Sequence, residues 1–186
     1  MVNKTNQRKT YRKARHIVLK QTAIDPIDHL WTFIGAFIGI SLIGSLQSIT
    51  LTSIDNTFLI GSFGASAVLI YGATSSALAQ PRNLIGGHFL SAIVGVTVAK
   101  LIPYAELNWL ACGLAVSVAI VIMQITKTMH PPGGATALIA NIGSLEIKDL
   151  GFLYVINPVC IGVLILFITA YITNKFARHR QYPYKQ

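Results

Sequence analysis

The sequence predicts an all-α, polytopic membrane protein built as a helical bundle, and three observations predict this class. The 186-residue chain is 53% hydrophobic and only 11% charged, whereas a soluble domain usually carries about 25% charged residues. Its mean hydropathy is +0.58. Its charges are clustered, so six blocks contain no Asp, Glu, Lys or Arg, and each is about long enough to cross a hydrocarbon core of roughly 30 Å. The blocks are residues 29–54, 56–81, 83–99, 107–126, 128–145 and 150–174.

These blocks predict six membrane segments, of which four are long helices and two are short or broken. Long helices are expected at residues 30–50, 84–102, 107–126 and 150–174. The segment at residues 57–79 is expected to break at residues 61–64 and again at residues 72–76, where Gly and Ser cluster. The segment at residues 131–142 begins at a Pro-Pro pair and ends before Gly143.

The order long, short, long occurs twice, which suggests an internal duplication with halves near residues 29–102 and 107–175. The sequence GATALI at residues 134–139 matches GASAVL at residues 64–69, seventy positions earlier. Two topologies remain open. Either all six segments cross and the halves are inverted, or four cross fully and the two short segments re-enter the membrane. Both topologies place the two chain ends on one side.

The net charge of +9 comes mainly from the two ends of the chain. Basic flanks remain cytoplasmic, so we expect basic cytoplasmic segments at residues 1–28 and 176–186 around a transmembrane domain at residues 29–175. The protein is expected in the plasma (inner) membrane, in contact with lipid and not with nucleic acid. The first apolar block begins too late and is too long for a cleaved signal peptide.

The two short segments suggest a site for a small anion. A helix N-terminus exposes unpaired N–H groups and about half a positive charge, which attracts anions where small residues leave the backbone open. We expect such starts near residues 61–64 and at Gly133, and an inverted repeat would direct both at one ion near the bilayer midplane. The residues expected to bind it are Gly61, Ser62, Phe63, Gly64, Ser66, His88, His130, Pro131, Pro132, Gly133, Gly134 and Thr136.

We make a separate prediction for each of four polar side chains near this site. A polar group such as His88 is expensive to bury within the membrane and is therefore read as functional. His130 either donates to an anion or binds a backbone carbonyl. Arg82 and Lys127 either attract the anion electrostatically or anchor the chain at the cytoplasmic surface.

The sequence supports other functions less well than anion transport. Cys112 and Cys160 lie in apolar blocks without a metal or redox motif, and no cofactor or metal is expected. No ATP-binding motif is present, so transport would be passive or coupled to an ion gradient. Two alternatives remain. One is an intramembrane hydrolase that uses Ser66 with a histidine as base, and the other is a structural or regulatory membrane subunit. We expect no enzyme activity.

Two stretches resemble the HPP family of small integral membrane proteins. One is MHPPGGATAL at residues 129–138, and the other combines GSFGASAVL at residues 61–69 with AQPRNLIGGH at residues 79–88. The resemblance covers about residues 28–175 and implies a four-spanning small-anion permease, with nitrite as the ion for some members.

A GxxxG sequence at residues 35–39 would suit the seam of a homo-oligomer, a dimer or trimer, or packing within one chain.

Overall fold

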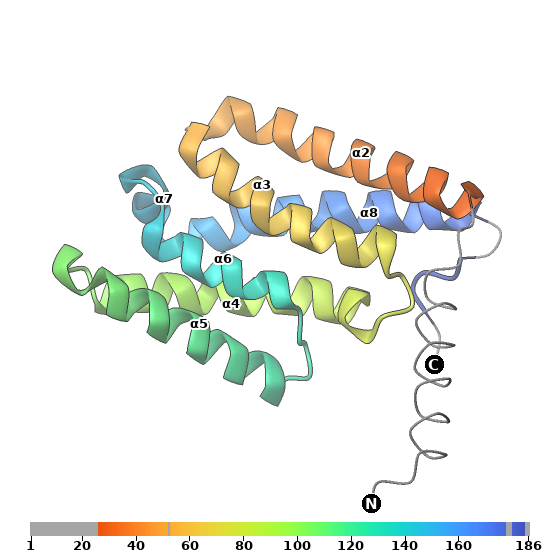
Figure 1. Ribbon diagram of the computed structural model, residues 1–186. Coiled ribbons are helices and arrows are strands. Elements are labelled where there is room, and N and C mark those ends of the chain that lie inside the picture. The colour runs from red at the N-terminus through yellow and green to blue at the C-terminus, as the bar shows by residue number, and fades with distance from the viewer. Residues whose placement is uncertain (1–25, 52, 178–179, 185–186) are drawn as a thin grey trace, which may run out of the picture.

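The computed structural model describes residues 26–51, 53–177 and 180–184, and the regular elements within them are all helical (Figure 1). The long helices are α2 (Pro26–Thr50), α4 (Pro81–Leu101), α5 (Asn108–Ile125) and α8 (Ile161–Phe176). The shorter α-helices are α3 (Ser53–Ala67), α6 (Pro131–Ile142) and α7 (Leu145–Leu150). The π-helical segments η1 (Val68–Gly72) and η4 (Val155–Cys160) and the 3-10 turns η2 (Ala77–Ala79) and η3 (Ala105–Leu107) complete the list. Of the basic segment expected at residues 1–28, only residues 26–28 lie within the described part.

Four helices are long and apolar enough to cross a membrane by length and composition. They cover Pro26–Ile49, Pro81–Leu101, Ala105–Ile125 and Val155–Phe176, and a shorter apolar helix covers Leu59–Gly72. Helix α6 has 12 residues and is therefore about 18 Å long, well short of a hydrocarbon core of roughly 30 Å. The all-helical membrane class is confirmed, and by this measure four segments rather than six qualify as full spans.

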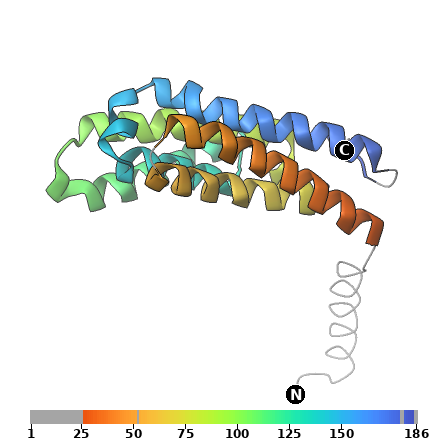
Figure 2. The same cartoon turned by 90° about the horizontal axis from the view of Figure 1, so that it is seen from above.

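The helices run side by side between two ends of the molecule (Figures 1 and 2). We call one of them the terminal end, because the first and last described residues meet there. Arg180 Nε lies 3.2 Å from Asp28 Oδ1, and Arg180 Nη1 donates to the carbonyl of Tyr71 at 2.8 Å. At the same end Arg82 Nη2 donates to the carbonyl of Thr126 at 2.8 Å.

The opposite end, called the distal end, holds the other connections. The carboxylate of Asp55, at the start of α3, accepts hydrogen bonds from the backbone N–H and the hydroxyl of Ser144, the N-cap residue of α7. Lys100, near the end of α4, places its ammonium 5.9 Å from the centre of the Phe152 ring. Helices α3 and α6 therefore both extend along the bundle, α3 towards the terminal end and α6 towards the distal end.

Proline determines where two of the helices begin. Gln80 and His130 both have extended backbone, and each precedes a proline at the first position of α4 or α6. A residue before proline is driven out of the helical region, while proline itself suits the first helical position. The predicted start and end of the short segment at residues 131–142 are confirmed. The predicted break at residues 72–76 is also present, since η1 ends at Gly72 and a turn follows.

The predicted break at residues 61–64 is wrong. Helix α3 continues through Gly61 and Gly64 without interruption. Glycine in a helix interior costs only about 1 kcal/mol, whereas backbone groups released in an apolar environment cost several kcal/mol each. A helix in lipid therefore tolerates two glycines more easily than an opening, so the first half of the chain has no helix N-terminus at this position.

The GxxxG sequence on α2 packs within the chain. A Cβ atom added to Gly35 would lie 2.6 Å from Tyr71 Cδ1, and one added to Gly39 would collide with the hydroxyl of Tyr71. The tyrosine hydroxyl continues across to α8 and donates to the carbonyl of Leu166 at 3.2 Å. These glycines therefore serve close packing within the chain.

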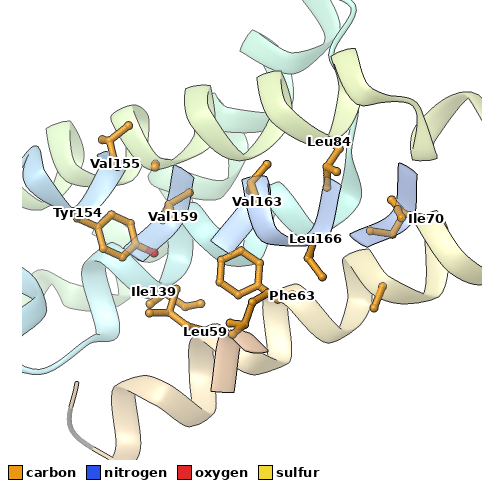
Figure 3. Close-up of a cluster of buried hydrophobic side chains, with 14 of the residues drawn as sticks. Leu59, Phe63, Ile70, Leu84, Ile139, Tyr154, Val155, Val159, Val163 and Leu166 are labelled. Atoms are coloured by element: carbon orange, nitrogen blue, oxygen red, sulfur yellow. The ribbon is translucent and has the colours of Figure 1, made fainter. Parts of the chain in front are cut away.

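The apolar core lies where α3, α6, η4 and α8 meet (Figure 3). Phe63 is fully buried there, and its ring fills the space above Gly162, where an added Cβ would collide with the ring. The ring centre of Phe63 is 5.6 Å from that of His88. Phe63 thus forms the apolar side of the environment of His88.

Candidate functional site

His88 lies at the centre of a buried polar cluster between α3, α4 and α6. It follows the first residue of α4 by seven positions, which places it about 10 Å along the helix from the terminal end. Its side chain is fully buried. Nε2 is 2.8 Å from the hydroxyl of Ser66 on α3, and Nδ1 is 2.7 Å from the hydroxyl of Thr136 on α6.

His130 approaches the same serine from the other side. Its Nε2 is 2.9 Å from Ser66 Oγ, and its Nδ1 is 2.8 Å from the carbonyl oxygen of Leu78 in η2. The two imidazole rings are 4.9 Å apart. Gly87 leaves the space for this approach, because a Cβ added there would lie 2.5 Å from the Cβ of His130. Of the two predicted roles for His130, the bond to a backbone carbonyl is present.

Ser62 extends the cluster by one helical turn towards the distal end. Its hydroxyl is 3.1 Å from that of Thr136 and 3.0 Å from the carbonyl oxygen of Pro132. We refer to the five side chains as the imidazole–hydroxyl network: Ser62, Ser66, His88, His130 and Thr136. All five were predicted as site residues, although their sequence separations reach 74 positions. Each is buried, as expected of polar groups inside a membrane bundle that bond to one another.

The turn that carries Leu78 is fixed by the C-terminal residues. Tyr182 donates its hydroxyl proton to the carbonyl of Ala79 at 2.9 Å. Burial raises the pKa of Tyr182 above its usual range, so this hydroxyl keeps its proton and remains a donor. Neither Leu78 nor Tyr182 was predicted as part of the site, because a backbone carbonyl and a residue of the basic tail give no sequence signal for it.

The N-terminus of α6 offers fewer backbone donors than predicted. Pro131 and Pro132 have no N–H group, and the N–H of Gly133 donates to the carbonyl of His130 at 2.8 Å. Together with the unbroken α3, this corrects the prediction that an ion is held between two short helix N-termini. The polar groups that converge are side chains, namely hydroxyls and imidazoles.

The predicted glycines fall into two groups. Gly133 is packed against α4, since an added Cβ would lie 2.9 Å from both Gly87 O and Ser91 Oγ. Gly61 and Gly64 face open space, with nothing within 4 Å of an added Cβ, and Gly134 has only Val116 at 3.9 Å. Gly134 and Pro131 line an apolar groove of about 480 Å³ between α5 and α6. These residues therefore surround the network without contributing polar groups to it.

Arg82 and Lys127 line one polar pocket of about 400 Å³ at the terminal end, together with Gln80 and Asn83. Arg82 lies in the first turn of α4, and Lys127 lies in the connection between α5 and α6. The bond from Asn83 Nδ2 to the carbonyl of Met129, 2.7 Å long, joins this turn to that connection beside His130. Both predicted cations therefore lie together at the terminal end of the bundle, close to His130.

A second pocket, at the distal end, was not predicted. It has a volume of about 300 Å³ and contains two cations, Lys100 and Lys148, with Asn141 among its lining residues. Asn141 is buried, and its Oδ1 has no hydrogen-bond partner in the described part of the chain. The hydroxyl of Ser91, one turn along α4 from His88, is also buried and unpartnered among the described residues. Buried polar atoms without a protein partner usually bind water or a ligand.

The described residues contain no group of three or more His, Cys, Asp or Glu side chains that could hold a metal ion. The polar chemistry of the site is therefore that of hydroxyls, imidazoles and nearby cations.

Comparison with known proteins shows the family to which the sequence belongs. A transmembrane protein of Dictyostelium discoideum is 47% identical over 154 residues, which cover 82% of this chain and 54% of that protein. A second transmembrane protein of the same organism is 49% identical over 154 residues, covering 82% of this chain and 49% of its own length. The chain thus spans about half the length of these relatives. No solved structure matches it.

The sequence model described as "HPP, transmembrane region" matches residues 21–183. This match covers nearly the whole chain, including every residue of the imidazole–hydroxyl network. The chain belongs to the HPP family of transmembrane proteins.

Proposed function

We propose that this protein is a transporter or channel for a small monovalent anion, with nitrite as the first candidate. The observation that carries the proposal is the imidazole–hydroxyl network, buried within a bundle of membrane helices. Hydroxyl and imidazole N–H groups are the neutral donors that a small oxyanion requires. Polar groups at membrane depth are expensive and usually mark a route for substrate or ions.

The pockets at the two ends extend this proposal, because each contains cations. Arg82 and Lys127 would attract an anion at the terminal end, and Lys100 and Lys148 would do so at the distal end. Between the distal pocket and the network, the unpartnered hydroxyl of Ser91 offers an intermediate donor. With the basic chain ends on the cytoplasmic side of the plasma (inner) membrane, the terminal pocket opens inward and the distal pocket outward.

The network would bind the ion by exchanging partners. In the structure its donors bond to one another or to backbone carbonyls. An entering anion must therefore replace some of these bonds. A neutral site also discriminates against multivalent anions, because their desolvation costs far more than that of a single charge.

We also propose that the chain arose by internal duplication. Ser66 and Thr136, seventy positions apart, each direct a hydroxyl towards the carbonyl four residues earlier, Ser62 at 3.3 Å and Pro132 at 3.5 Å. Each also contacts one nitrogen of His88. The two matching segments thus present equivalent hydroxyls to opposite edges of one imidazole ring.

The direct test is uptake of nitrite, nitrate, formate and chloride into liposomes that contain only the purified protein. We expect saturable nitrite uptake, which His88→Gln reduces at least about tenfold because one network bond is lost and another weakened. His29→Gln, the same substitution at an exposed position on α2, is the matched control and should retain uptake. Absence of uptake of all four anions by folded protein would refute the proposal and favour a structural or regulatory subunit that acts with a partner.

One observation favours a second candidate, an intramembrane serine hydrolase. Ser66 Oγ lies within hydrogen-bond distance of two imidazole nitrogens, as a nucleophile beside a general base does. However, Ser66 is fully buried, so a substrate would not reach its hydroxyl in this structure. Labelling of the protein by a fluorophosphonate, abolished by Ser66→Ala, would support the hydrolase over the transporter.

A further inference from the structure

We infer that the imidazole–hydroxyl network is a proton relay that couples anion uptake to the inward movement of one proton. This inference rests on the proposed transport of a small anion. It adds the co-transported ion, the route of the proton and its direction. The evidence is the order of donors and acceptors that the five side chains impose on one another.

With both imidazoles neutral, the hydrogen bonds permit one arrangement of protons along the network. The carbonyl of Leu78 only accepts, so His130 carries its proton on Nδ1 and its Nε2 must accept from Ser66. The single hydroxyl proton of Ser66 is then used, so His88 must donate to Ser66 from Nε2. His88 Nδ1 therefore accepts from Thr136.

From Thr136 onwards the donors point the same way, from the distal side of the network to the terminal end. Thr136 donates to His88, and His88 donates to Ser66. The hydroxyl of Ser62, at the distal side, can donate to the carbonyl of Pro132 or turn to Thr136 and extend this order. Ser66 donates to His130, whose Nδ1–H faces the Leu78 carbonyl. A series of hydrogen bonds with this polarity can pass a proton from the distal side of the network towards the terminal end.

The transfer is balanced at each step. A proton that binds Ser62 Oγ releases that hydroxyl's own proton to Thr136, whose proton then moves to His88 Nδ1. His88 releases its Nε2 proton to Ser66, and Ser66 releases its own to Nε2 of His130. Every hydroxyl is restored and His88 ends neutral with its proton on Nδ1, so the net change is one proton gained by His130. His130 gives up this proton to the departing anion or to water at the terminal end, and its imidazole becomes neutral again.

The network can also provide hydrogen-bond partners for His130 in its protonated, positively charged state. When His130 is protonated on both nitrogens, Ser66 accepts from His130 Nε2 and donates its own proton to His88 Nε2, which the relay has left bare. His88 Nδ1–H then donates to Thr136, Thr136 donates to Ser62, and the hydroxyl of Ser62 donates to the carbonyl of Pro132 at 3.0 Å. The protonated network is therefore satisfied without movement of the backbone.

Among the described residues, no carboxylate is bonded to the imidazoles as a counter-ion for this charge. From α4 and α6 the two imidazoles face each other and Thr136, from α3 they face Ser62, Ser66 and Phe63, and from η2 they face Leu78. The nearby tyrosines Tyr154 and Tyr182 donate to the carbonyls of Thr136 and Ala79. No carboxylate, lysine or arginine among the described residues hydrogen-bonds to either imidazole.

An anion is the missing counter-ion. A lone anion or a lone imidazolium is expensive to bury at this depth, whereas the pair is neutral overall. Co-binding would therefore make each ion's entry depend on the other. Nitrite uptake should increase as the pH on the distal side falls, and it should not respond to membrane potential.

The test measures nitrite uptake and lumen pH together in liposomes that contain the purified protein and a trapped pH-sensitive dye. The liposomes carry K⁺ and valinomycin to set the membrane potential, and protein-free liposomes give the background permeation of nitrous acid. We expect nitrite uptake to acidify the lumen in proportion. Ser66→Ala should reduce nitrite-dependent acidification at least about tenfold, because it interrupts the relay between the two imidazoles.

Two further variants keep the result interpretable. Ser66→Thr retains the hydroxyl and should preserve acidification if it folds. Ser117→Ala removes an exposed hydroxyl of α5 that bonds only to the carbonyl four residues earlier, and should behave as the parent protein. Each variant is used only after it elutes from size-exclusion chromatography as a monodisperse species, as the parent protein does.

The outcomes separate the two proposals. Nitrite uptake that follows membrane potential, leaves lumen pH unchanged and persists in Ser66→Ala would overturn the relay and leave anion transport standing. No nitrite uptake by any folded variant or by the parent protein would overturn both. Acidification that is lost in Ser66→Ala and kept in Ser66→Thr and Ser117→Ala would support the relay.

Discussion

The segments around Gly64 and Gly134 have nearly the same sequence but different local structures. The first segment begins in the last turn of α3 and continues into η1 without a break, and Gly64 faces open space. In α6 the segment follows two prolines at the helix start, and the adjacent Gly133 is pressed against α4. Glycine alone therefore did not create a break, while proline did. What the segments share is a hydroxyl, Ser66 or Thr136, aimed at His88.

The largest effect on this arrangement is expected from His88→Ala. It removes the ring that joins the two segments, leaves a cavity and deprives two buried hydroxyls of a partner. We expect the free energy of unfolding to fall by about 3–5 kcal/mol, measured as a lower thermal midpoint in detergent. Phe89→Ala, at the neighbouring and exposed position, should change the midpoint much less. Equal effects would show that the segments are not joined through His88.

Gly133→Ala should have the next largest effect. Its Cβ would meet the backbone of Gly87 on α4, which cannot yield as a flexible side chain would, so we expect a loss of about 3 kcal/mol. Gly134→Ala is the matched control at the next position, where the nearest atom is 3.9 Å away. If thermal unfolding shows the two variants to be equally stable, the close packing of α6 on α4 is wrong.

Thr136→Val sharpens the comparison by removing a hydroxyl while keeping the shape of the side chain. His88 Nδ1 would lose its partner and Ser62 one of its two, so we expect a loss of about 1–2 kcal/mol, together with reduced nitrite uptake in liposomes. The matched control is Thr97→Val, which alters an exposed threonine that bonds only to the carbonyl of Ile93. Uptake that is unchanged in Thr136→Val would remove this hydroxyl from the transport site.

The smallest effect is expected from Gly64→Ala. The added methyl group meets no atom within 4 Å, and alanine favours a helix over glycine by up to about 1 kcal/mol. The thermal midpoint should therefore stay constant or rise slightly. A marked fall would indicate that α3 opens at this position, as the sequence alone suggested.

The polar site could be predicted as a set of residues but not as an arrangement. Small and polar residues in apolar blocks are unusual enough to single out Ser62, Ser66, His88, His130 and Thr136. Their bonds join positions between 22 and 74 residues apart, and no local pattern contains such pairings. Lys100, Lys148 and Asn141 were missed for the same reason, because they become a pocket only where α4, α6 and α7 meet.

The sequence by itself determined the membrane class, the long helices and the start of α6, because hydrophobic length and proline act locally. Tertiary structure decided the rest. Whether Gly64 breaks a helix depends on its surroundings, since an apolar environment penalises an opened backbone more than it penalises glycine. The direction of the hydrogen bonds from Thr136 to His130 was also a tertiary outcome. It is imposed by the carbonyl of Leu78, a backbone atom of a distant turn that the C-terminal Tyr182 helps to fix.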